Sequence, residues 1–87
     1  MFYVYILKSK KDDELYIGST NNLKRRVEEH NKEKSFGTKF RTPFELVYYE
    51  AYKKESDARR RELSLKVRGN ARRWLKERLQ DSLKNDN

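Results

Sequence analysis

The 87-residue sequence contains no cysteine, one proline and three glycines. Because it lacks cysteine, the chain cannot form disulfides, thiolate metal sites or a cysteine nucleophile, and it fits a reducing compartment. Apolar runs are also short, and the run FYVYIL at residues 2–7 cannot span a bilayer. Lysines follow this run, whereas a secretory signal carries its positive charges before the apolar segment. We therefore expect no membrane span, no signal peptide and a cytoplasmic location.

Charged residues make up 41% of the chain and hydrophobic residues 34%, so little apolar material is available for a core. This length supports one small domain, which we place at residues 1–83, followed by a frayed tail at 84–87. The formal net charge of +8 attracts polyanions, of which nucleic acid is the commonest. An anionic membrane and a merely solvated charged surface are the alternatives. We expect a monomer or a weak dimer.

The apolar patterns predict three strands and three helices. The expected strands are residues 2–7, 15–19 and 44–52, and the expected helices are 22–32, 56–66 and a third beginning at about residue 70, with a loop at 33–43. Ser56 and Asn70 are the expected N-caps of the later helices. Ala71, Trp74, Leu75 and Leu79 give the third helix an apolar stripe. The fold class is therefore α+β: a small, three-stranded, mainly antiparallel sheet in ββαβαα order, flanked by helices.

The first predicted helix carries polar residues on its apolar side. At about 100° per residue, His30 falls within the stripe formed by Leu23 and Val27, and Arg26 falls at its edge. A lone histidine in such a stripe is more often a hydrogen-bonded core residue than a catalyst. The residues expected to face solvent are Arg25, Glu28 and Glu29.

The second predicted helix has a carboxylate in its buried stripe. Helical spacing places Glu62 between Ala58 and Leu65, the residues that should face the sheet. Burial of an unpaired carboxylate is costly, so Glu62 must be paired, protonated or bound to a cation. One interpretation is a structural salt bridge with an arginine such as Arg26. The other is a metal ligand or catalytic acid, and helix geometry does not separate the two.

The tyrosines and one glycine form a third unusual pattern. Tyr3 and Tyr5 share one face of the first strand, and Tyr16 lies in the second strand just before Gly18. A glycine within a strand marks close approach by another backbone or a ligand. The tyrosines interpreted as core or rim residues are Tyr3, Tyr48, Tyr49 and Tyr52.

Together these residues resemble the GIY-YIG nuclease superfamily. The resemblance rests on YVY at 3–5, YIG at 16–18, the helix LKRRVEEH and a later helix bearing Glu62, and it runs from Tyr3 to about Arg73. It is closest to the small stand-alone bacterial members, with the nuclease domain of the DNA-repair excinuclease more distant. Three positions depart from the pattern: Tyr3 replaces a glycine, Ser19 stands where excinuclease relatives often have lysine, and Asn70 is an insecure match to a family asparagine.

The resemblance implies hydrolysis of DNA phosphodiesters with one divalent metal ion, Mg²⁺ or Mn²⁺. The residues that match the family's catalytic positions are Tyr5, Tyr16, Arg26, His30 and Glu62, with Glu62 as the metal ligand. By that likeness Tyr5 is the first choice as base and Tyr16 holds the water or phosphate, but His30, with an ordinary pKa near 6.5, is the easier base chemically. The sequence leaves this choice open. We expect Tyr16, Arg26 and His30 to lie on the side facing the helix of Glu62.

A set of basic residues completes the predicted nucleic-acid surface: Lys39, Arg41, Arg59, Arg61, Lys66, Arg68, Arg72 and Arg73. Such groups bind phosphates without reading sequence. We therefore expect a metal-dependent endonuclease that is structure-directed or weakly specific for duplex or branched DNA and acts in DNA repair or processing, with a targeting protein as an optional further partner. A catalytically weak nucleic-acid-binding module is the first alternative. A structural protein that contacts a partner through the helix of Trp74 is the second.

Overall fold

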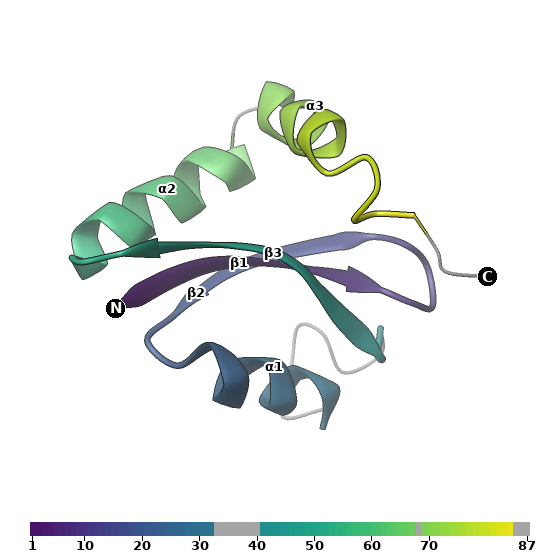
Figure 1. The fold of residues 1–87 in the computed structure, drawn as a ribbon, viewed down its shortest axis with the longest axis horizontal. Coiled ribbons are helices and arrows are strands. Elements are labelled where there is room, and N and C mark those ends of the chain that lie inside the picture. The colour runs from purple at the N-terminus through teal and green to yellow at the C-terminus, as the bar shows by residue number, and fades with distance from the viewer. Residues whose placement is uncertain (33–40, 68, 85–87) are drawn as a thin grey trace.

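The structure is a computed structural model that describes residues 1–32, 41–67 and 69–84, with the side chains of 69–72 outside this description. Its elements are β1 (Phe2–Ser9), β2 (Leu15–Thr20), α1 (Leu23–Asn31), β3 (Phe44–Tyr52), α2 (Glu55–Val67) and α3 (Gly69–Arg78) (Figure 1). The α+β class and the ββαβαα order are therefore confirmed. The predicted loop at 33–43 lies mostly outside the described residues, as do 85–87 of the predicted tail.

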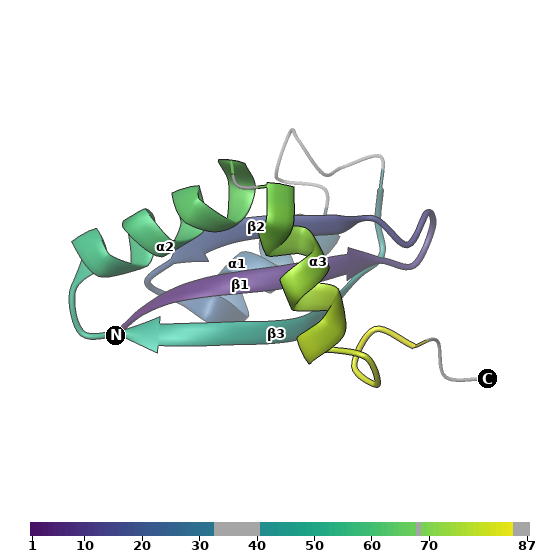
Figure 2. The ribbon, with the colours of Figure 1, turned by 90° about the horizontal axis from the view of Figure 1, so that it is seen from above.

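The strands form one antiparallel sheet in the order β2-β1-β3, with β1 in the centre (Figure 2). In its register, Tyr5 of β1 lies opposite Gly18 of β2 and Tyr49 of β3. The β1–β3 register shifts between Ile6 and Leu7. Because side chains alternate along a strand, this register places Tyr3, Tyr5 and Tyr49 on one face of the sheet.

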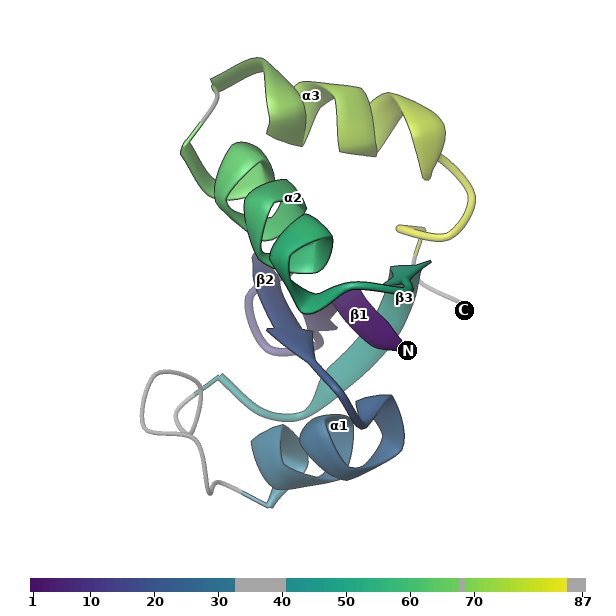
Figure 3. The same ribbon diagram turned by 90° about the vertical axis from the view of Figure 1, so that its left-hand side faces the viewer.

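The two faces of the sheet are covered by different helices. α2 and α3 lie over one face, and α1 lies under the other (Figures 1 and 3). The first core packs Val4 and Ile6 against Leu65 of α2 and Leu75 of α3. The second core contains Tyr5, Leu7 and Phe44, with Leu23 and Val27 of α1 packed against it. We call these the α2–α3 face and the α1 face.

The helix boundaries follow the local hydrogen bonds. The side chain of Asn22 caps α1 by accepting a bond from the backbone N–H of Arg25 at 3.1 Å. Ser56 is not the cap of α2, because the helix begins at Glu55 and the amide of Ala58 already bonds the carbonyl of Lys54. Asn70 is not a cap either, since α3 begins at Gly69. The peptide bond between Thr42 and Pro43 is cis.

The predicted stripe of α3 is only partly buried. Leu75 and Leu79 lie in the core, but the side chain of Trp74 is 37% exposed. Its indole ring packs against the guanidinium groups of Arg61 and Arg78, at 5.0 and 4.3 Å from the ring centroid. Trp74 therefore covers charged groups at the α2–α3 junction instead of filling the core. In the part of the chain that is described, no helix has the length and apolar character needed to cross a membrane.

Candidate active site

The ring of Tyr5 crosses from β1 over β2 at Gly18. A Cβ atom at residue 18 would lie 2.4 Å from the Tyr5 hydroxyl oxygen and 2.5 Å from the ring carbon that carries it. No real Cβ tolerates such contacts, so residue 18 must be glycine for Tyr5 to keep this position. The close approach predicted for Gly18 is therefore made by a side chain of the neighbouring strand.

His30 of α1 closes over the Tyr5 hydroxyl. The hydroxyl lies 2.9 Å from Nε2 of His30, and the histidine is fully buried. The imidazole also packs edge-on against Tyr16 and Phe44, with ring centroids at 4.9 and 6.0 Å. Burial, and secondly the positive charge of Arg26, lower the pKa of His30 from 6.5 to about 4. His30 is therefore a neutral imidazole at neutral pH.

Arg26 is the third member of this cluster. Burial raises the pKa of Tyr5 to about 12, although a hydrogen bond and the charge of Arg26 act in the opposite direction. Burial alone would lower the pKa of Arg26, but its interactions with Tyr5, Glu29 and Tyr16 outweigh burial and raise it. A guanidinium can only donate. The Tyr5 oxygen therefore accepts from Arg26, and a second hydrogen bond joins it to Nε2 of His30, with the donor set by the tautomer of the imidazole.

Tyr16 lies on the same face of the sheet as Tyr5, two residues before Gly18 in β2 and opposite Leu7 of β1. It is half-buried, and its ring packs against Tyr5 at 6.4 Å and Phe44 at 6.5 Å between centroids. Tyr5, Tyr16 and His30 thus form one aromatic cluster between the sheet and α1, with Arg26 at its edge. Arg26 keeps 30% of its side chain exposed, as expected for the rim of the helix stripe.

Glu62 lies on the other side of the sheet. α2 covers the α2–α3 face, where Oε1 of Glu62 accepts a hydrogen bond from the Ser19 hydroxyl at 2.6 Å and Oε2 binds Nζ of Lys66 at 2.6 Å. The expectation that the site residues of β2 and α1 face the helix of Glu62 is therefore wrong for Tyr16 and His30, whereas Arg26 lines a hollow that α2 also lines. The predicted pairing with Arg26 is also wrong, because Lys66 on the same helix is the partner.

The α1 face and the α2–α3 face of the sheet meet at its edge, where β2 ends between α1 and α2 (Figure 3). A hollow of about 540 Å³ is lined by residues that include Arg26 and Glu29 of α1 and Arg59 of α2. A second hollow of about 320 Å³ is lined by Ser19, Arg59, Glu62, Leu63 and Lys66. Both hollows share Ser19 and Arg59. We call the two hollows together the β2-edge groove. Tyr5 and His30 do not line it but are buried next to Arg26, which does.

The groove offers few ligands to a metal ion. Among the described residues, no three acidic, histidine or cysteine side chains gather closely enough to hold one. Glu62 nevertheless fits a weakly held Mg²⁺ or Mn²⁺ ion, because it keeps 19% of its side chain exposed and such ions often use one carboxylate with water and phosphate oxygens. The Ser19 hydroxyl beside it is a further neutral oxygen. Lys66, however, occupies one carboxylate oxygen of Glu62.

The other predicted DNA-binding residues are dispersed. Arg59 lines the groove and is 71% exposed, paired only loosely with Glu55 at 3.5 Å. Arg41 binds Asp12 at 3.2 Å, and Arg61 is held by Glu50, so the structure does not bring these two into the groove. Arg73 is exposed on α3. Lys39, Arg68 and the side chain of Arg72 lie outside the described residues.

Several groove residues, among them Ser19, Arg25 and Glu29, were not recognised as site residues from the sequence. Arg25 and Glu29 were expected only to face solvent, yet both line the larger hollow and bind each other at 3.4 Å. Ser19 was noted only as a position where excinuclease relatives often have lysine. The signal for Ser19 was its position two residues after Ile17, on the same face of β2 as the core.

The fold defines a small α+β domain, and comparison with known proteins identifies its family. The family model described as the GIY-YIG catalytic domain matches residues 1–78, and the chain belongs to this family. It is 45% identical over 69 residues to a UPF0213 protein of Clostridium perfringens, covering 76% of this chain and 71% of that protein. It is also 45% identical over 78 residues to a UPF0213 protein of Natronomonas pharaonis, covering 88% and 87%.

A solved structure supports the fold. The solution NMR structure of a UPF0213 protein from Bacillus halodurans superposes with a TM-score of 0.56 and 33% sequence identity, covering 92% of this chain and 86% of that one. The resemblance drawn from YVY, YIG and the two helices is therefore confirmed for the family.

Proposed function

We propose that this protein is a DNA endonuclease that hydrolyses phosphodiesters with a single divalent metal ion. The observation that carries the proposal is that Arg26 and Glu62, from opposite faces of the sheet, line two hollows at the β2 edge that share Ser19 and Arg59. The guanidinium can bind phosphate oxygens directly, and the carboxylate would bind them only through a metal ion that it holds. The buried Tyr5–His30 pair lies directly behind Arg26.

Arg26 would bind the scissile phosphate. Its planar fork is permanently charged and matches two phosphate oxygens. In the free protein the guanidinium instead contacts Tyr5, whose side chain is 1% exposed. Binding of a phosphate draws Arg26 toward the groove and uncovers the tyrosine hydroxyl for the attacking water. Arg59, on the opposite wall, would hold a neighbouring phosphate.

Tyr5 and His30 would act together as the base. With a pKa of about 12, Tyr5 cannot supply a stable phenolate at neutral pH, but it can take a proton from water while its own proton passes to Nε2 of His30. Phosphate bound to Arg26 offsets the charge that helps to lower the pKa of His30, which makes the imidazole a better acceptor. Tyr16 orients the imidazole by packing against it.

Glu62 would hold the metal ion, with Ser19 fixing one carboxylate oxygen. When bound, Mg²⁺ or Mn²⁺ would neutralise charge on the phosphate and on the departing oxygen. Since the groove presents cations and a carboxylate but no base-reading element among the described residues, recognition is structure-directed or weakly specific. We propose that the protein processes or repairs DNA in the cytoplasm. It would act as a monomer or weak dimer that a targeting protein directs.

The second candidate is a nucleic-acid-binding module with little catalysis. The observation in its favour is that both oxygens of Glu62 already have partners, Ser19 and Lys66. Incubation of the protein with plain, nicked and branched duplex DNA in Mg²⁺ or Mn²⁺ separates the two. The nuclease cleaves at least one substrate, EDTA stops it, and Glu62→Gln abolishes it while Asp57→Asn, a matched change on the same helix outside both hollows, does not. Binding without cleavage of any substrate would establish the second candidate instead.

A further inference from the structure

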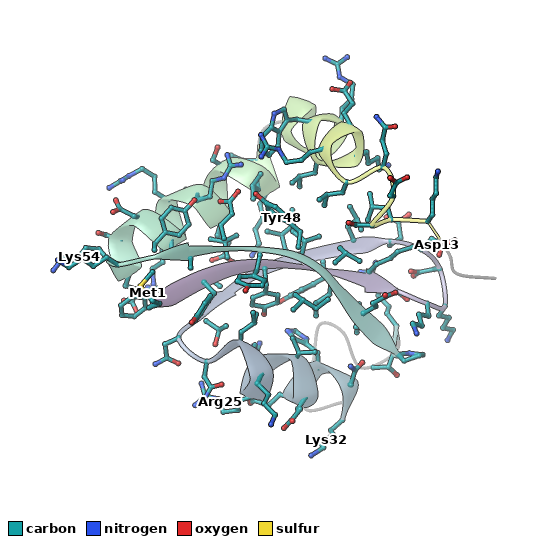
Figure 4. The ribbon with its side chains drawn as sticks, in the orientation of Figure 1. Met1, Asp13, Arg25, Lys32, Tyr48 and Lys54 are labelled. Atoms are coloured by element: carbon teal, nitrogen blue, oxygen red, sulfur yellow. The ribbon has the colours of Figure 1, made fainter. Side chains whose placement is uncertain are left out.

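A half-buried ion pair joins β3 to α2 at the edge of the sheet opposite to the β2-edge groove. The carboxylate of Glu50 accepts hydrogen bonds from both Nε and Nη2 of Arg61, at 2.9 and 3.2 Å. It also accepts the hydroxyls of Tyr48 at 2.7 Å and Tyr52 at 2.5 Å. Figure 4 shows Tyr48 on the α2–α3 face of the sheet, beneath α3. Four hydrogen bonds therefore hold one carboxylate in a single position.

The Glu50–Arg61 ion pair is covered by α3. The ring of Trp74 lies 5.0 Å from the guanidinium carbon of Arg61, and the guanidinium of Arg78 lies 4.3 Å from the same ring. Burial opposes ionisation of Glu50, but the bonds from Arg61 and the two tyrosines lower its pKa overall. Because two parallel hydrogen bonds join the guanidinium of Arg61 to the carboxylate of Glu50, the ion pair fixes the orientation of the two groups as well as the distance between them.

The position of Arg61 in the chain gives the pair a consequence at the groove. Arg61 and Glu62 are neighbours in α2 and lie on opposite sides of its buried stripe, about 60° and 40° from Ala58. Arg61 reaches β3 at one edge of the sheet, and Glu62 reaches Ser19 of β2 at the other. Any rotation of α2 about its axis moves both residues together.

We infer that Glu50 is the positioning residue for Glu62: by holding Arg61 against β3, it fixes the rotation of α2 and keeps the carboxylate of Glu62 in the β2-edge groove. This inference rests on the proposed function, because it assigns Glu50 to the metal-ligand side of that site. The pair lies outside both hollows, so Glu50 acts through Arg61 and α2 and does not touch substrate.

The rotation of α2 can be measured without activity. Because the chain has no cysteine, nitroxide labels on Asn21→Cys, before α1, and Arg60→Cys, on the outer side of α2, are specific. Double electron–electron resonance then gives the distance distribution between the labels. Glu50→Gln and Arg61→Lys broaden or shift it, whereas Glu45→Gln, an exposed charge change on the same strand, leaves it unchanged. An unchanged distribution in Glu50→Gln would overturn the inference.

Turnover supplies the second readout. Glu50→Gln lowers kcat by about 10- to 100-fold, as expected for a misplaced reacting group, with KM for DNA unchanged because Arg26 and Arg59 remain. Leu83→Ala removes a core contact at the far end of the domain and controls for lost stability. A broadened distribution with full kcat in Glu50→Gln would refute positioning. If the wild-type protein cleaves no substrate but Glu50→Gln broadens the distance distribution, Glu50 controls the rotation of α2 and the nuclease function is rejected.

Discussion

The hydroxyl of Tyr5 lies over Gly18, where a Cβ atom would be 2.4 Å from the tyrosine oxygen. This contact joins the two tyrosine motifs of the chain, because Gly18 belongs to YIG and Tyr5 to YVY. The same hydroxyl meets His30 of α1 at 2.9 Å. The glycine of the second motif therefore serves the tyrosine of the first, and the three residues form one packed unit.

Gly18→Ala is expected to displace Tyr5. The tyrosine is fully buried, so it cannot turn into solvent, and overpacking of this kind costs about 1–3 kcal/mol of unfolding free energy. Loss of the Tyr5–His30 hydrogen bond should also reduce cleavage by at least tenfold. Urea unfolding and the histidine ring signals in NMR spectra measure the two effects. In a Tyr5→Leu background the same alanine should cost much less, and an equal cost in both backgrounds would contradict the contact.

Arg26→Gln is expected to raise the pKa of His30 above its value of about 4. The charge of Arg26 is the second cause of that low pKa, after burial, so its removal restores part of the shift while the value stays below 6.5. The titration of the imidazole carbons, followed by NMR, measures it. Arg25→Gln is the matched control, since Arg25 carries the same charge on the same helix but is exposed. Equal shifts in both variants would refute the assignment.

The stability of the protein is expected to fall as the pH decreases from 6.5 to 4. The pKa of His30 is 6.5 in the unfolded chain and about 4 in the folded one, so the unfolded state binds more protons between these values. Stability from this residue is complete above pH 6.5 and decreases by up to about 3 kcal/mol at pH 4. Unfolding free energies of wild type and His30→Gln, compared at pH 7 and pH 4.5, isolate it. Identical losses in both proteins would show that carboxylates alone are responsible.

Much of the α1 side of the site was predictable because it depends on local periodicity. Leu23, Val27 and His30 repeat at helical spacing, and the structure packs all three against the sheet, with Arg26 at the rim. Gly18 within a strand likewise indicated a close contact. These features require only the chain's own spacing and the alternation of strand side chains.

The α2 side was predicted less well because it depends on pairing between distant elements. Helical spacing predicted Glu62 within the buried stripe, and the structure leaves its side chain 19% exposed, but the choice of partner among 22 basic residues is set by tertiary position. Lys66 pairs with it through the helix itself, and Arg61 is taken by Glu50. Similarly, the helix spacing of Trp74 predicted burial in the core, whereas two arginines hold its ring near the surface. Sequence spacing does not reveal which face each helix covers.

Lys66→Met is expected to strengthen binding of Mn²⁺ to the free protein. Nζ of Lys66 lies 2.6 Å from Oε2 of Glu62 and occupies a position that a divalent cation needs, so the two cations compete. The lysine is 45% exposed, and such an ion pair contributes roughly 0.2–1 kcal/mol, which corresponds to a gain in affinity of at most about fivefold. Electron paramagnetic resonance of Mn²⁺, which detects the free ion, measures the dissociation constant without any need for cleavage.

The control for this prediction removes an equal charge from the same helix. Arg60→Met breaks the exposed pair with Asp57 but leaves Glu62 and Lys66 in place, so it reports only the effect of net charge on cation binding. Glu62→Gln locates the site, because it should weaken Mn²⁺ binding in both the parent and the Lys66→Met background. If Lys66→Met and Arg60→Met change the affinity equally, Lys66 does not compete for the carboxylate. If Glu62→Gln leaves the affinity unchanged, the ion binds elsewhere and Glu62 is not its ligand.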